Sequence, residues 1–184
     1  MQSKYIKNFL SSELCDKIIR KYNNDSLLFN PMIYDSNKNL KYDSLYNKRK
    51  INYLDDNDCN ELTQVTNLLS NYIETEIKKI SLKFKNIRYT FNKYQEGDFL
   101  NYHFDEDEIY RGALYTFVLE LNEDYVGGEF IYKNEHDVEI INEKSKGGLF
   151  IFDSTIIHKV TPIIEGTRFS LNCWPKFNKK NTLI

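Results

Sequence analysis

Apolar positions follow a helical period in the first half of this 184-residue chain. Between residues 58 and 80 they recur every three or four residues, as on one face of a helix: Cys59, Leu62, Val65, Leu68, Leu69, Tyr72, Ile73, Ile77 and Ile80. A shorter stripe over residues 14–22 follows Ser11 and Ser12, either of which can cap a helix. We expect two helices, the longer one across the outside of a sheet, and strands at residues 5–10 and 49–54.

After residue 84 the pattern changes to short runs of β-branched and aromatic residues separated by turn signals. These runs predict strands near residues 87–94, 114–121, 129–133, 137–141, 148–152, 157–161 and 167–174. All seven glycines lie between Gly97 and Gly166. Many short strands with glycine-rich turns indicate a sandwich or barrel. We therefore predict a mostly β fold, a double-stranded β-helix (jelly roll) with two N-terminal helices packed on one sheet.

No linker or internal repeat divides the chain, so residues 1–184 are predicted to form a single domain. Residues 1–83 would provide helical support, and residues 84–175 would form the jelly-roll core. Residues 30–48 are polar, rich in tyrosine and without a clear period. They fit either a lid that folds over a binding site or an ordinary surface loop.

Net charge and cysteine content limit the candidate cellular compartments and classes of binding partner. The net charge of −2 provides no basic field for nucleic acid or an anionic membrane. Three cysteines without CxxC spacing argue against a disulfide framework and a zinc knuckle. No apolar run of about 18 residues is present, and the first residues lack a signal-peptide core. These features predict a cytoplasmic protein, while the oligomeric state stays open.

The candidate chemistry centres on His103-Phe-Asp105. In an extended backbone, residues i and i+2 point to the same side, so this imidazole and this carboxylate can chelate one ion. His158 follows a second apolar strand and can complete the set from a neighbouring strand. Two histidines and one carboxylate on one face leave open positions, as in non-haem Fe(II) oxygenases. The alternative is an exposed pair together with a buried, hydrogen-bonded histidine, whereas His136 in a polar turn is read as a surface residue.

Alternation in the last predicted strand places Arg168, Ser170, Asn172 and Trp174 on one face. Phe169, Leu171 and Cys173 take the other face, which is the plainer packing surface. If Arg168 points into the roll, it must meet an anion, and a planar guanidinium suits a carboxylate held by two hydrogen bonds. An arginine on an edge strand in water is the alternative.

Taken in order, several segments of the chain resemble the prolyl-4-hydroxylase-like branch of the 2-oxoglutarate and Fe(II)-dependent dioxygenases. They are Tyr94-x-x-Gly97-Asp98-Phe99, His103-x-Asp105, Leu121-Asn122 with Gly127-Gly128-Glu129-Phe130, Gly148-Leu-Phe-Ile-Phe152, and His158-Lys-Val-Thr-Pro162 with Gly166-Thr-Arg168-Phe-Ser170. The combination is specific, and it covers the second half of the chain well and the first 85 residues loosely.

The resemblance implies that His103, Asp105 and His158 bind Fe(II), and that Arg168 pairs with the distal carboxylate of 2-oxoglutarate. Ser170, on the same face as Arg168, belongs to the implied cosubstrate site. The family's cofactors would be Fe(II), 2-oxoglutarate and O2, with ascorbate as an optional addition. Its activity couples decarboxylation of 2-oxoglutarate, to succinate and CO2, with hydroxylation of a C–H bond.

Further cosubstrate and substrate contacts follow from the same resemblance. Tyr94 and Thr116 would line the cosubstrate pocket, whereas Glu120 stands where the family often has tyrosine. Tyr115 would replace that tyrosine if the strand register differs. Trp174 and Glu106 are candidate substrate contacts. The acidic run at residues 106–108 either favours a cationic substrate or is a solvated loop.

The family resemblance predicts hydroxylation of a protein or peptide, with a prolyl residue as the leading substrate. Free amino acids and other small molecules are the alternative substrates. The alternative from another class of function is a non-catalytic jelly-roll module that only binds its ligand. The carboxylate ligand Asp105 argues against halogenating relatives, and Trp174 replaces the second arginine that is typical of nucleic-acid demethylating ones.

Overall fold

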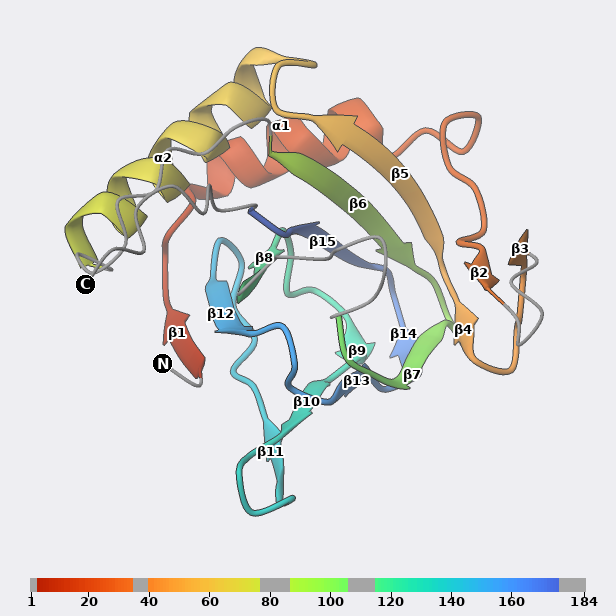
Figure 1. Cartoon of the computed structure of the whole chain (residues 1–184). Helices are drawn as coiled ribbons and strands as arrows, with labels where there is room; N and C mark the ends of the chain where they lie inside the picture. Colours follow the sequence, from red (N-terminus) through yellow and green to blue (C-terminus); the bar gives the residue numbers. More distant parts are fainter. Residues whose placement is uncertain (1–2, 35–39, 77–86, 106–114, 176–184) are drawn as a thin grey trace.

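A six-stranded antiparallel sheet and a five-stranded one form the body of the protein in the computed structural model, which describes residues 3–34, 40–76, 87–105 and 115–175 (Figure 1). The larger sheet has the order β1-β12-β8-β15-β6-β5. Its strands are β1 (Ser3–Ile6), β5 (Lys50–Asp55), β6 (Arg88–Tyr94), β8 (Tyr115–Glu120), β12 (Leu149–Asp153) and β15 (Arg168–Cys173).

The five-stranded sheet has the order β11-β10-β13-β7-β4. Its strands are β4 (Asn47–Lys48), β7 (Phe99–His103), β10 (Phe130–Lys133), β11 (Glu139–Ile141) and β13 (His158–Val160). Two short pairs complete the strands, β9 (Val126–Gly127) with β14 (Ile163–Glu165) and β2 (Ile33–Tyr34) with β3 (Leu40–Lys41). The mostly β fold predicted from the sequence is confirmed.

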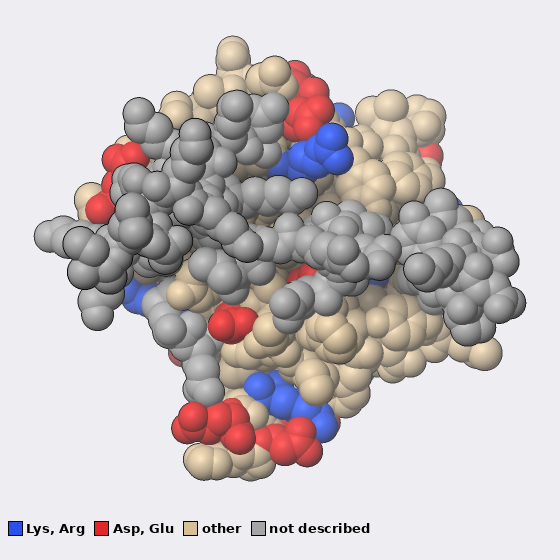
Figure 2. All heavy atoms as spheres, in the orientation of Figure 1, with Lys and Arg blue, Asp and Glu red and all other residues tan. Residues whose placement is uncertain are grey.

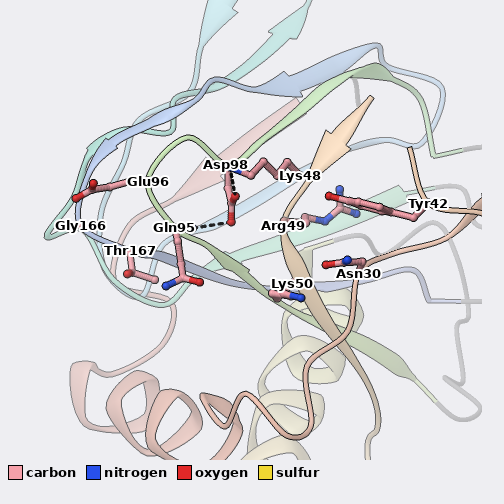
Figure 3. A pocket seen from close by; sticks show the side chains of 10 residues that line it. All are labelled: Asn30, Tyr42, Lys48, Arg49, Lys50, Gln95, Glu96, Asp98, Gly166 and Thr167. Carbon is pink, nitrogen blue, oxygen red and sulfur yellow. Dashed lines mark hydrogen bonds and ion pairs between the residues drawn. The ribbon is translucent and has the colours of Figure 1, made fainter. Parts of the chain in front are cut away.

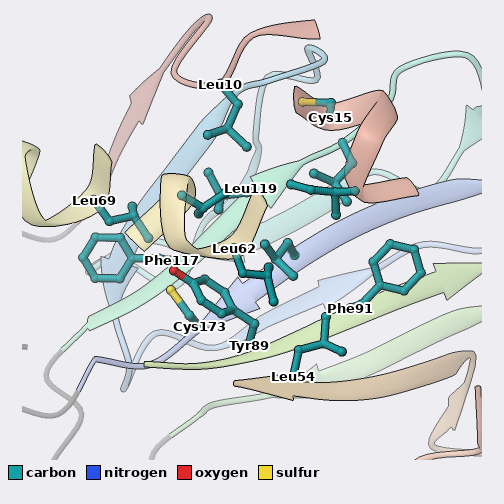
Figure 4. Close-up of a cluster of buried hydrophobic side chains, with 14 of the residues drawn as sticks. Leu10, Cys15, Leu54, Leu62, Leu69, Tyr89, Phe91, Phe117, Leu119 and Cys173 are labelled. Carbon is teal, nitrogen blue, oxygen red and sulfur yellow. The ribbon is translucent and has the colours of Figure 1, made fainter. Parts of the chain in front are cut away.

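Two helices share one hydrophobic cluster with the larger sheet (Figures 1 and 4). In α1 (Ser12–Tyr22), Ser11 is the cap, because its Oγ accepts a hydrogen bond from the amide of Leu14 at 3.2 Å. Four residues of α2 (Asn60–Glu76) are fully buried: Leu62, Val65, Leu69 and Ile73. They meet Phe117 and Leu119 of β8. The helical period therefore gives α2 the apolar face that packs on the sheet.

Strand alternation separates this cluster from a second one on the other side of the larger sheet. Phe117 and Leu119 face the helices, whereas Val118 between them belongs to the second cluster. That cluster also takes Phe130 and Val160 from the smaller sheet. Side chains at every second position of β8 and β15 therefore enter the space between the two sheets, where the candidate site lies.

Several boundaries differ from those predicted. The first strand ends at Ile6 rather than Leu10, because Asn8 adopts a left-handed backbone (φ 54°) and the amide of Leu10 bonds to Gly147. In the predicted helix stripe Leu68 is 39% exposed, since it lies about 100° around α2 from Leu69. The stripe residues Ile77 and Ile80 lie outside the described residues. Sequence patterning also missed β9 and β14, because strands of two or three residues carry too little alternation.

Charged side chains of both signs adjoin on the face seen in Figure 2. At the hairpin formed by β10 and β11, Lys133 pairs with Asp137 at 2.8 Å and Lys159 pairs with Glu139 at 3.2 Å. Over the residues described, neither helix is both long enough and apolar enough to cross a bilayer.

Candidate metal and cosubstrate site

Two histidines face each other across neighbouring strands of the smaller sheet. His103 ends β7 and pairs with His158, the first residue of β13, and their ring centroids are 4.1 Å apart. The Nδ1 atoms lie 2.9 Å from the carbonyl oxygens of Asn101 and Ile156, respectively. Because a carbonyl only accepts, each Nδ1 carries the hydrogen, and each Nε2 presents its lone pair to the space between the sheets.

Asp105 supplies the carboxylate, although β7 ends two residues before it. Its amide donates to the carbonyl of Ser154, and this bond brings the side chain back beside the histidines. Its carboxylate oxygens lie 3.5 Å from Nε2 of His103 and 3.7 Å from Nε2 of His158. Thr116 Oγ1 donates to the same carboxylate at 2.7 Å. The Asp105 backbone is therefore fixed by the residue that follows β12, and its carboxylate is held by Thr116 of β8.

The electrostatics of this cluster keep its donors in the forms that bind metal. Burial alone would raise the pKa of Asp105, but the proximity of His158 and His103 and the hydrogen bond from Thr116 outweigh burial and lower that pKa. Burial, together with the charge of His103, lowers the pKa of His158 to about 4, against the opposing effect of Asp105. At neutral pH the site thus presents a carboxylate and a neutral imidazole.

The donor set fits a divalent transition metal. One ligand atom from each of His103, Asp105 and His158 lies within 4.8 Å of the others, and all three side chains are at least partly buried. Hydrogen bonds from Nδ1 of each histidine to a backbone carbonyl, and from Thr116 to Asp105, orient the metal-binding atoms, as in established metal sites. Two imidazoles and one carboxylate on one side leave coordination positions open toward the cavity.

Arg168, the predicted carboxylate anchor, is buried and already paired with Glu120. Its Nη2 donates to Glu120 Oε1 at 2.6 Å, and the two side chains are only 1% and 4% exposed. Burial alone would lower the pKa of Arg168, but the charge of Glu120 outweighs it and raises that pKa. Ser170, predicted to lie in the cosubstrate site, approaches Arg168 Nη1 at 3.5 Å.

This ion pair leaves bonding capacity on both partners. Among the described residues, Arg168 Nε and Glu120 Oε2 are shielded from solvent and have no hydrogen-bond partner. The guanidinium therefore keeps donors for a second carboxylate, as the distal carboxylate of 2-oxoglutarate requires, but must share its charge with Glu120. The residues present therefore fit Fe(II). They also fit 2-oxoglutarate, but its distal carboxylate would compete with Glu120 for Arg168.

A cavity of about 160 Å³ joins the metal-capable cluster to Arg168. Tyr94 lines it, and the ring of Tyr94 lies within reach of two guanidiniums, at 5.2 Å from Cζ of Arg168 and 5.8 Å from Cζ of Arg49. Trp174, the predicted substrate contact, also lines this cavity. The metal-capable side chains and two guanidinium groups therefore line one cavity.

A larger hollow of about 680 Å³ lies next to this cavity and shares Arg49 with it (Figure 3). Its wall includes Lys48, whose Nζ is 3.5 Å from Asp98, and the Asp98 carboxylate also accepts a bond from the amide of Gln95. The metal-capable histidines do not line this hollow. Its size alone therefore does not make it the candidate site.

Some predicted site residues take other places. Tyr115 packs against the cluster beneath the helices, on the face opposite Thr116, so it does not replace the tyrosine expected at Glu120. Thr116 lies against Asp105, and Glu106 lies outside the described residues. Sequence reasoning missed Arg49, because residue spacing alone does not place it in the cavity that His103 lines.

Comparison with known proteins agrees with this geometry. Residues 89–176 match the family model of the 2OG-Fe(II) oxygenase superfamily. A PKHD-type hydroxylase of Shewanella oneidensis is 36% identical over 92 residues, which cover 46% of this chain and 40% of that protein. One from Shewanella baltica is 33% identical over 91 residues, with the same shares. The match thus spans less than half the length of these curated relatives.

Solved structures share the fold across nearly the whole chain. A Pseudomonas putida prolyl-4-hydroxylase gives a TM-score of 0.78 at 20% identity, covering 96% of this chain and 92% of that one. A prolyl hydroxylase from Trichoplax adhaerens, bound to a peptide fragment of hypoxia inducible factor, gives 0.76 at 16% identity, with 97% and 84% covered. The resemblance predicted from the sequence is confirmed: residues 89–176 match the 2OG-Fe(II) oxygenase superfamily, and PKHD-type hydroxylases are similar over about the same half of the chain.

Proposed function

We propose that the protein is an Fe(II)- and 2-oxoglutarate-dependent hydroxylase. The observation that carries the proposal is the convergence of two fixed Nε2 atoms and one carboxylate at the wall of a cavity that also contains Arg168. When bound, the iron and cosubstrate supply the oxidising chemistry, in which 2-oxoglutarate and O2 give succinate and CO2 and a C–H bond is hydroxylated.

The chain's own residues position these groups. His103, Asp105 and His158 hold the metal, and Thr116 keeps the Asp105 carboxylate turned toward it. Arg168 receives the distal carboxylate of 2-oxoglutarate, with Ser170 beside it and the Tyr94 ring against the guanidinium. Fixing both ends of the cosubstrate removes orientational freedom that would otherwise slow the reaction.

For the substrate, we propose a protein or peptide and, within it, a prolyl residue. The solved structures with this fold whose names state prolyl hydroxylation support this proposal. A free amino acid or other small molecule is the second candidate, which the guanidinium of Arg49 favours because its Nη1 has no hydrogen-bond partner among the described residues. We also propose a cytoplasmic location, residues 1–83 as helical support of the jelly-roll core, and no part for nucleic acid.

Anaerobic addition of Fe(II) and 2-oxoglutarate tests the metal and cosubstrate roles together. We expect a weak visible charge-transfer band in the wild type, no band in Asp105→Ala, and an unchanged band in the control Asp55→Ala, whose carboxylate is exposed. Persistence of the band in Asp105→Ala would refute the ligand assignment. Release of succinate under O2 separates a hydroxylase from a jelly-roll module that only binds.

A further inference from the structure

Arg49 reaches the candidate site from the point where the chain passes from one sheet to the other. It follows β4, which pairs with β7 of the smaller sheet, and precedes β5, which pairs with β6 of the larger sheet. Its Nε donates to Asn92 Oδ1 at 3.2 Å, which fixes the guanidinium at the wall of the metal cavity. The passage of the chain from β4 to β5 thus positions the side chain, and the buried amide of Asn92 holds it.

The guanidinium of Arg49 has no anion to meet in the described parts of the chain. Its Nη1 is shielded from solvent and makes no hydrogen bond there, and no carboxylate pairs with it across those residues. Arg168, by contrast, already has Glu120. Arg49 as a whole is half-buried, but an N–H group shielded from water without an acceptor is costly, so Nη1 is arranged for an anion that enters the cavity.

Two further polar atoms in the same cavity are unsatisfied within the described structure. They are the amide oxygens of Asn47, a residue that is only 2% exposed, and of Asn172. An amide oxygen accepts hydrogen bonds, so both atoms call for N–H or O–H donors. Arg49 lines this cavity together with His103, Asp105 and His158. A molecule bound here would lie beside the metal.

We propose that Arg49 binds a carboxylate of the hydroxylated substrate, while Asn47 and Asn172 accept hydrogen bonds from its amino or hydroxyl groups. This inference rests on the proposed function and deepens it by naming the substrate class. The carboxylate belongs either to a free amino acid or to the C-terminal residue of a peptide. Arg168 remains the anchor of the cosubstrate, so the two guanidiniums of the cavity serve different carboxylates.

Binding to protein loaded with Mn(II) and 2-oxoglutarate tests this proposal. The probes are the twenty L-amino acids, their amides, and a proline peptide without acidic residues, made with either a free or an amidated C-terminus. Thermal stabilisation and fluorescence of Trp174, the single tryptophan, report binding. We expect stabilisation by at least one free acid or free-ended peptide, and binding about 10- to 100-fold weaker for its amide and for Arg49→Gln.

Variants at neighbouring positions separate the carboxylate contact from other effects of substitution. Lys50→Gln removes a neighbouring charge that does not line the metal cavity, and we expect it to bind as the wild type does. Arg49→Lys keeps the charge and should bind with intermediate affinity. If acid and amide bind equally to the wild type, or if no probe binds in a way that depends on Arg49, the proposal is wrong.

The Fe(II) and 2-oxoglutarate charge-transfer band, measured without any of these probes, shows whether Arg49 binds the substrate or the cosubstrate. We expect the band to be unchanged in Arg49→Gln. If instead it returns only at raised 2-oxoglutarate concentration, Arg49 binds the cosubstrate and the substrate assignment is overturned. Absence of the band from the wild type would refute the proposed hydroxylase, whereas acid binding that depends on Arg49 would still be measurable in the Mn(II)-loaded protein.

Discussion

Replacing Glu120 by glutamine tests whether an internal carboxylate competes with the cosubstrate. Glutamine keeps the shape of the side chain and removes its charge. In the wild type the pair of Glu120 and Arg168 joins two almost fully buried groups at 2.6 Å. The distal carboxylate of 2-oxoglutarate, bound to the same guanidinium, would lie about 5 Å from that of Glu120, a separation set by the size of the shared guanidinium.

The magnitude follows from the repulsion of the two carboxylates. At about 5 Å and an effective dielectric constant of about 20, two like charges repel by about 3 kcal/mol. Relaxation of the site reduces this value, so we expect Glu120→Gln to bind 2-oxoglutarate about 10- to 100-fold more tightly. The ligand-free variant should be destabilised by about 3–5 kcal/mol, because its arginine is left buried without an anion, and 2-oxoglutarate should restore much of that stability.

Fluorescence of Trp174 in the Mn(II)-loaded protein measures the affinity for 2-oxoglutarate, and chemical denaturation measures the stability. Glu123→Gln, an exposed acidic position close by in the chain, is the matched control and should leave both quantities unchanged. Equal or weaker binding of 2-oxoglutarate by Glu120→Gln would refute the competition. It would mean that Glu120 holds Arg168 in position for the cosubstrate.

Three further outcomes test the site and the core. Arg168→Ala should raise the 2-oxoglutarate concentration for half-saturation more than about tenfold while Fe(II) still binds, and an unchanged affinity would remove the anchor role. In the metal-free protein the pKa of His158 is about 4, against about 6.5 when unfolded, so the unfolded chain takes up the proton first. The free energy of unfolding, measured by chemical denaturation, should therefore fall by about 3 kcal/mol between pH 6.5 and 4. A variant that lacks His158 should not show this fall. Leu69→Ala should lower the free energy of unfolding by about 2–5 kcal/mol, because Leu69 is fully buried. Leu68→Ala, at an exposed position, should lower it by less than about 1 kcal/mol. Equal losses would contradict the packing described.

Local patterning determined the elements and much of the site. Alternation in β15 correctly separated Arg168 and Ser170 from the packing face, because the period of a strand is a property of the backbone alone. Helical spacing found the face of α2 for the same reason. The order of His103, Asp105 and His158 identified a metal-capable set before any contact was known.

Tertiary structure alone decided which charges meet. Glu120 and Arg168 are 48 residues apart, and they pair because β8 and β15 are neighbours in register with Ser170 opposite Glu120. Arg49 enters the cavity only because the chain changes sheets at that residue. Strand order and register arise from the packing of both sheets together, and no local period encodes them. The sequence therefore predicted the donors of the site, but not the carboxylate that already occupies its arginine.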